Sequence, residues 1–581
     1  MKSIALPMLL VCVITIGCGT QYDNAKASPQ AMPMSKSVAY SPTTGGTPNN
    51  TMPAPVMPSA DKSDVKGLIK ESAVAEESAT APAGEPDVVP AAPEKPVEMK
   101  VEAEPPKQPE FNTEAYDYVQ DNPFMLAQQN PLSTFSIDVD TASYSNMRRF
   151  LSQSMLPPKD SVRIEELVNY FTYDYQPPQN DVPFATHIEI ADCPWSIKHR
   201  LVRVALKGKE IPLDKRPLTN LVFLLDVSGS MADENKLPLL KRAFKLLVDQ
   251  LGENDRVAIV VYAGASGLAL PSTTGDHKET ILAALENLAA GGSTNGGEGI
   301  ELAYKTAMDH LIKGGVNRVI LATDGDFNVG TTDQGSLLRT IEEKAKSGVF
   351  LTVLGFGMGN YKDSTLEKLA DKGNGNYAYI DTYNEAKKVF IEQMSGTLIT
   401  IAKDVKIQIE FNPAKVAAYR LLGYENRLLR AEDFKDDTKD AGEIGAGHTV
   451  TALYEIVPVG EKLDIPGVDA LKYQTAPAPS AVQSDELLTL KLRYKDPTSD
   501  TSKPLEFPVK ESGTKLSQAS ADFKFAASVA AFGMILRDSK YKGNAGLDLV
   551  LEMASDGKGT DKSGYRAEFI ELVRKAKELK K

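Results

Sequence analysis

The sequence predicts an α/β protein built around a doubly wound, mostly parallel sheet. Apolar runs alternate with segments of helical spacing through the middle of the 581-residue chain. The run 220–225 is almost continuously apolar, as expected of a strand that is buried on both faces of a parallel sheet. It ends abruptly in the polar loop 226–230, which places hydroxyl and carboxylate groups at the carboxyl end of this strand. Open α/β sheets bind their ligands at that edge.

Periodicity predicts the other elements of this domain, which we expect to cover residues 216–400. Leu240, Phe244, Leu247 and Leu251 recur at helical spacing and are expected to pack on the sheet. The predicted strands are 221–225, 257–262, 319–322, 350–354 and 377–380, with a short antiparallel edge strand at 268–270. The predicted helices are 237–251, 277–288, 299–312, 337–347, 365–371 and 384–394.

The loop 226–230, called the first loop below, has the pattern of a cation site. Asp226, Ser228 and Ser230 alternate along one tight turn, so their oxygens can point at a common centre. Oxygen ligands with few charges suit a hard cation. Mg²⁺ is the expected ion because it retains waters and open positions, with Ca²⁺ and Mn²⁺ as alternatives.

The first loop resembles the start of the metal-ion-dependent adhesion site of the von Willebrand factor A domain. The resemblance implies two more ligand loops, and both have counterparts in the chain. Residues 291–296 resemble the second loop, and residues 322–325, which follow a buried strand, resemble the third. In this family an Asp or Glu of a partner protein completes the metal shell. The implied metal ligands here are Asp226, Ser228, Ser230, Thr294 and Asp324.

The amino terminus has the pattern of a secreted lipoprotein. Residues 1–17 combine Lys2 with a short apolar core, which predicts a signal peptide. The residues before Cys18 resemble a bacterial lipobox, which implies lipidation at Cys18 and a membrane anchor in the cell envelope. Gly19 after the cysteine resembles the sorting pattern of lipoproteins of the outer membrane, which implies that location in a host that has one. Residues 18–110 are rich in Pro, Ala, Thr and Glu and predict a disordered tether.

Three further regions flank the central domain. Residues 111–215 predict an α+β domain, in which Asp140 and Thr141 are expected to cap a helix. Its stretches FSIDVDTASYSNMRRFL and RIEELVNYF resemble the amino-terminal domain of a family of bacterial envelope lipoproteins with an A domain. Residues 401–515 alternate with period two and predict an antiparallel β-domain. Residues 516–581 predict a helical segment. Residues 401–515 and 516–581 together resemble the carboxy-terminal part of the same family.

Composition and motifs limit the function classes. The formal charge of −13 argues against a nucleic acid partner. The sequence lacks H-E-x-x-H, G-x-S-x-G and G-x-x-x-x-G-K-[ST], so we predict that the protein is not an enzyme. The favoured function is binding of a protein that presents an acidic residue to the bound cation. A metal-dependent phosphoesterase and a metal-independent structural envelope protein are the alternatives.

Overall fold

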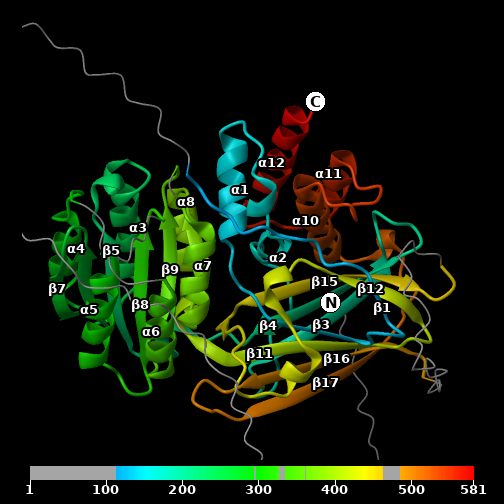
Figure 1. Cartoon of the computed structure of the whole chain (residues 1–581), viewed down its shortest axis with the longest axis horizontal. Helices are drawn as coiled ribbons and strands as arrows, with labels where there is room; N and C mark the ends of the chain where they lie inside the picture. Colours follow the sequence, from blue (N-terminus) through cyan, green and yellow to red (C-terminus); the bar gives the residue numbers. More distant parts are fainter. Residues whose placement is uncertain (1–112, 293–295, 326–333, 360, 462–483) are drawn as a thin grey trace, which may run out of the picture. The chain divides into compact units, whose positions relative to one another are not determined.

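The computed structural model describes residues 113–581 apart from 293–295, 326–333, 360 and 462–483. Its central sheet has the strand order β10-β9-β8-β5-β6-β7 (Figure 1). β7 pairs antiparallel with β6 at the edge, as predicted, and the other neighbours pair in parallel. The strands are β5 (Thr219–Asp226), β6 (Arg256–Tyr262), β7 (Ser266–Thr274), β8 (Val316–Thr323), β9 (Phe350–Phe356) and β10 (Tyr377–Ile380).

Helices cover both faces of this sheet, which confirms the doubly wound fold. Leu221, Phe223 and Leu225 of β5 pack in the core on one face, whereas Val222 and Leu224 pack in the core on the other. The first face is covered by α3 (Leu237–Asp249), α4 (Lys278–Glu286) and α8 (Tyr383–Lys387), followed by a π-helical turn (Lys388–Glu392) and α9 (Met394–Leu398). The second face is covered by α5 (Gly296–Asp309), α6 (Gln334–Lys346) and α7 (Asp363–Lys372).

Two antiparallel sheets form a sandwich with an apolar core between them. One sheet has the order β1-β12-β15-β4-β3, and the other has the order β13-β2-β11-β16-β17, with β14 beside β11. The first sheet consists of β1 (Met125–Leu126), β12 (Val416–Leu422), β15 (Thr449–Pro458), β4 (Arg200–Gly208) and β3 (Phe184–Asp192). The second consists of β13 (Leu428–Leu429), β2 (Leu132–Ser136), β11 (Thr400–Phe411), β14 (Ile444–Gly445), β16 (Glu486–Lys495) and β17 (Ser502–Lys510).

The sandwich differs from the domain division predicted for the flanking regions. Ala205 of β4 lies opposite Thr451 of β15, and Phe135 of β2 lies opposite Ile407 of β11. Strands from 111–215 and 401–515 therefore share both sheets, and the central α/β domain is inserted between them in sequence. Local periodicity shows that a segment is a strand but does not show which distant strand it pairs with.

Five helices from the two ends of the described chain form a layer on the first antiparallel sheet (Figure 1). Cys193 and Trp195 are buried in the core of this layer. Among the described residues, none of the helices has the length and apolar character needed to span a bilayer. The layer contains α1 (Ala142–Ser152), α2 (Ile164–Asn169), α10 (Ala521–Arg537), α11 (Leu547–Asp556) and α12 (Tyr565–Leu579).

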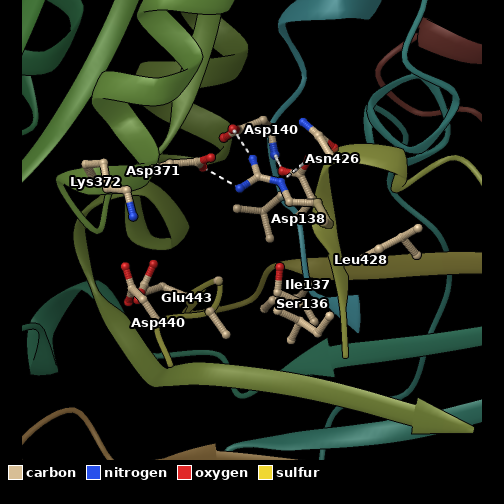
Figure 2. A pocket seen from close by; sticks show the side chains of 16 residues that line it. Ser136, Ile137, Asp138, Asp140, Asp371, Lys372, Asn426, Leu428, Asp440 and Glu443 are labelled. Carbon is tan, nitrogen blue, oxygen red and sulfur yellow. Dashed lines mark hydrogen bonds and ion pairs between the residues drawn. The ribbon is translucent and has the colours of Figure 1, made fainter. Parts of the chain in front are cut away.

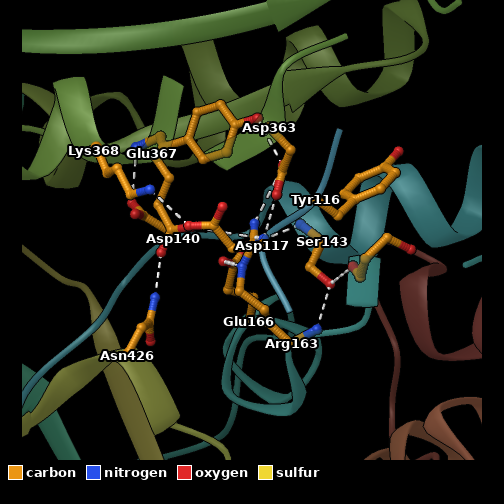
Figure 3. A network of polar contacts seen from close by, with 12 residues as sticks. Tyr116, Asp117, Asp140, Ser143, Arg163, Glu166, Asp363, Glu367, Lys368 and Asn426 are labelled. Atoms are coloured by element: carbon orange, nitrogen blue, oxygen red, sulfur yellow. Dashed lines mark hydrogen bonds and ion pairs between the residues drawn. The ribbon is translucent and has the colours of Figure 1, made fainter. Parts of the chain in front are cut away.

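Buried arginines link the central domain to the rest of the structure. The guanidinium of Arg163, which immediately precedes α2, bonds to Glu166 of that helix and to Asp363 at the start of α7 (Figure 3). Arg427 ends the 3-10 helix before β13 and lines a cavity of about 220 Å³, together with residues of the central domain and of the segments on either side of it in sequence (Figure 2). Its guanidinium pairs with Asp371 of α7. Each arginine thus joins an acid of α7 to a segment outside the central domain.

Asp140 belongs to the Arg427 network and does not cap α1, so that expectation was wrong. Its Oδ1 accepts a hydrogen bond from the Tyr377 backbone N–H at 2.7 Å, and its Oδ2 lies 3.4 Å from Arg427. Thr141 occupies the position before α1 but makes no side-chain capping bond. The Asp140 carboxylate thus bonds to the Arg427 guanidinium and the Tyr377 N–H instead of to the first backbone N–H groups of α1.

We expect Arg427→Met to lower the free energy of unfolding by about 3–5 kcal/mol. Asp138 and Asp140 are buried, and Arg427 is the cation that offsets both charges. Arg430→Met is the matched control because that side chain is 77% exposed. Urea unfolding at neutral pH measures both changes. Equal stability of the two variants would contradict the role given to Arg427.

Candidate metal centre

The first loop lies where the order of the parallel strands reverses. β5 pairs with β6 on one side and with β8 on the other, and the chain reaches β8 only after passing through β6 and β7. Asp226 is the last residue of β5 and is fully buried. Its register places it opposite Tyr262 of β6, and Thr323 ends β8 next to it. Crevices at such reversals are the usual ligand sites of open α/β sheets.

Neutral donors hold the Asp226 carboxylate in place. The Ser228 backbone N–H and hydroxyl donate to Oδ1 at 2.9 and 2.6 Å. The Thr323 hydroxyl donates to Oδ2 at 3.0 Å, and the Tyr262 hydroxyl does so at 3.3 Å. Burial raises the pKa of Asp226, the Ser228 bonds oppose that shift, and the nearby Asp324 carboxylate adds to it. The ionised form therefore lacks a full counter-charge among these contacts.

The serine hydroxyls of the first loop have the spacing that a hard cation requires. The Oγ atoms of Ser228 and Ser230 lie 3.0 Å apart. Adjacent ligands in an octahedral Mg²⁺ shell lie roughly 3 Å apart, since each metal–oxygen distance is about 2.1 Å. Ser228 is buried and Ser230 is exposed, so the oxygens extend from the interior to the surface. The donor set and its spacing fit Mg²⁺.

The second and third loops contact the first. The Gly291 N–H donates to the Val227 carbonyl at 2.8 Å, and the Gly229 N–H donates to the Gly292 carbonyl at 3.1 Å. The start of the second loop is therefore hydrogen-bonded to the first loop, whereas Thr294 lies outside the described residues.

Asp324 of the third loop is buried and bonds through Oδ2 to the Lys236 ammonium at 3.1 Å. The same ammonium donates to the Ser230 carbonyl at 3.0 Å, which ties the third loop to the first. Gly325 has a φ of +100°, and a Cβ there would collide with the backbone at Tyr361 and Lys362. The third loop can take this path only because glycine follows Asp324.

The structure thus places the Ser228 hydroxyl in contact with both the Asp226 carboxylate and the Ser230 hydroxyl, and Lys236 connects Asp324 to the Ser230 carbonyl. Metal binding by these residues stays a prediction, as does lipidation of Cys18, which lies outside the described residues. Three residues that contribute to the site, Tyr262, Thr323 and Lys236, were not predicted from the sequence. Tyr262 and Thr323 end the strands on either side of β5, and this position was a usable signal.

We expect Asp226→Asn to raise the free energy of unfolding of the metal-free protein by about 1 kcal/mol at pH 7.5. The raised pKa of Asp226 means that ionisation costs stability once the pH exceeds the usual aspartate range. The difference should shrink as the pH falls through that range, because wild-type Asp226 then becomes neutral. Chemical unfolding in chelator across pH tests this, with Asp309→Asn, at the exposed end of α5, as control. A destabilised Asn variant at neutral pH would contradict it.

Comparison with known proteins identifies the three regions of the chain. Residues 220–392 match the model of the von Willebrand factor type A domain. Residues 110–203 match a model described as von Willebrand factor, and residues 396–579 match one described as uncharacterized protein YfbK, C-terminal.

The chain is also similar to individual proteins. Uncharacterized protein YfbK of Escherichia coli strain K12 is 48% identical over 471 residues, which cover 79% of this chain and 80% of that protein. Human inter-alpha-trypsin inhibitor heavy chain H4 is 31% identical over 165 residues, or 27% of this chain and 17% of that protein. A solved von Willebrand factor type A structure from Catenulispora acidiphila has 17% identity and a TM-score of 0.38, covering 68% of this chain and 91% of that one. The chain therefore belongs to the YfbK family, and in it a von Willebrand factor type A domain is combined with a YfbK carboxy-terminal region.

Proposed function

We propose that this protein binds another protein through a divalent cation, with Mg²⁺ as the expected ion. Asp226, Ser228, Ser230 and Asp324 would hold the ion, together with Thr294 of the second loop. The observation that supports this most strongly is that the Ser228 hydroxyl contacts both the Asp226 carboxylate and the Ser230 hydroxyl at the edge of the parallel sheet. The match of residues 220–392 to the type A domain model supports the same assignment.

The character of the ligands favours a carboxylate as the completing group. Only two of the five proposed ligands are charged, and the serine and threonine hydroxyls are neutral. When bound, a cation in this environment supplies an open coordination position with remaining positive charge. Ser230 is exposed, so the completing group can approach from solvent. An Asp or Glu side chain of a partner protein meets these requirements.

Anchoring at the membrane through Cys18 is part of the proposal. The signal-like residues 1–17 and the tether-like composition of 18–110 support it. The anchor would keep the binding domain in the cell envelope, facing partners there.

Capture from envelope extracts tests the function. Full-length protein is immobilised and washed in Mg²⁺, and bound proteins are eluted with chelator. We expect a specific set to elute from the wild type and to be absent from Asp226→Ala. Asp309→Ala is the matched control, because it removes an exposed carboxylate from the same domain and should retain the full set.

A second step identifies the completing group. Replacing the responsible Asp or Glu of a captured protein by Asn or Gln should abolish its binding. Partners that bind Asp226→Ala as well as wild type, or that resist chelator, would contradict the proposal.

A further inference from the structure

Lys236 lies inside the candidate metal centre although it is not one of the proposed ligands. Its ammonium is 3.1 Å from Asp324 Oδ2 and 3.0 Å from the Ser230 carbonyl oxygen. The residue is only 6% exposed, which is unusual for a lysine and indicates a fixed position. Lys236 immediately precedes α3. The packing of α3 on the sheet therefore fixes the position of the Lys236 backbone.

The stem of Lys236 occupies a slot that depends on glycine. Gly357 has a φ of +73°, and a Cβ added there would overlap the methylene groups of Lys236. The slot therefore aligns the side chain toward the third loop. Among the described residues, the other acid paired with the ammonium is Asp233, at 3.7 Å, but it is 59% exposed and water screens its charge. The buried partner of the ammonium is Asp324.

Lys236 changes the net charge of the centre. The formal charges of Asp226 and Asp324 together equal that of a divalent cation. The ammonium already offsets one of these two charges, so a loaded centre keeps one positive charge in excess. A single carboxylate from outside removes that excess. The same ammonium repels an incoming divalent cation and competes with it for Asp324.

We propose that Lys236 is a specificity-determining residue that weakens binding of the cation alone and makes the loaded centre select an anionic group. This inference rests on the proposed metal-dependent function. The Lys236 charge couples the two binding events, because a carboxylate that arrives with the cation relieves the repulsion. Cation and acidic partner then bind more tightly together than either does separately.

Titration of the full chain with Mn²⁺ tests the inference. The electron paramagnetic resonance signal of free Mn²⁺ measures how much of the ion is bound. Lys236→Met keeps the stem and removes the charge, and we expect it to bind Mn²⁺ more tightly by on the order of tenfold. Lys236→Arg keeps the charge and should bind as weakly as wild type. Lys245→Met is the control, because it removes an exposed charge from the same helix and should leave the affinity unchanged.

Acetate serves as the simplest carboxylate in a second titration, with Asp226→Ala correcting for chelation by acetate itself. We expect acetate to tighten Mn²⁺ binding more in the wild type than in Lys236→Met. Thermal unfolding verifies that each variant is folded, and Lys236→Gln replaces the Met variant if that variant is unfolded.

The outcomes separate this inference from the proposed function. Wild type that binds Mn²⁺ with the same affinity and acetate response as Lys236→Met would overturn the role of Lys236 while leaving the metal centre intact. Absence of Mn²⁺ binding in wild type and in every lysine variant would overturn both.

Discussion

The burial of one carboxylate, that of Asp226, is the constraint on which the candidate site depends. The side chain ends the central strand between β6 and β8, where the sheet itself excludes water. A buried carboxylate needs either hydrogen bonds or a counter-charge. The neighbouring strands supply hydroxyls from Tyr262 and Thr323, and the first loop folds back to supply Ser228. β6, β8 and the first loop therefore each place a hydroxyl group against the Asp226 carboxylate.

Buried acids at the α7 contacts and at the candidate site have different hydrogen-bond partners. Arginines pair with the acids between α7 and the flanking segments, as Arg163 does with Asp363 and Arg427 with Asp371 (Figures 2 and 3). In contrast, every hydrogen bond that the described residues make to Asp226 comes from a neutral group. Paired acids stabilise the assembly of the chain's parts. An acid supplied only with neutral donors retains the capacity to bind a cation.

The fold of the central domain could be predicted from the sequence because the patterns that indicate its strands, helices and first loop are local. Apolar strands, helical spacing and the D-x-S-x-S pattern lie within short segments, and the strand ends predicted which side chains meet at the sheet edge. The prediction that residues 111–215 and 401–515 form separate domains was wrong because β2 and β11 pair across a long insertion. The periodicity of a strand does not indicate its distant partner. Lys236 was missed for a similar reason. Its position depends on Gly357 and Asp324, which are far away in sequence.

The central claim is that oxygens of the first and third loops converge on one cation site at the carboxyl edge of the sheet. Crystals of the full chain grown with Mn²⁺, measured at a wavelength where manganese scatters anomalously, test it most directly. The account predicts one strong anomalous peak at about 2.1 Å from the Ser228 and Ser230 hydroxyl oxygens. A peak located elsewhere, or a site filled only by water at saturating Mn²⁺, would contradict it.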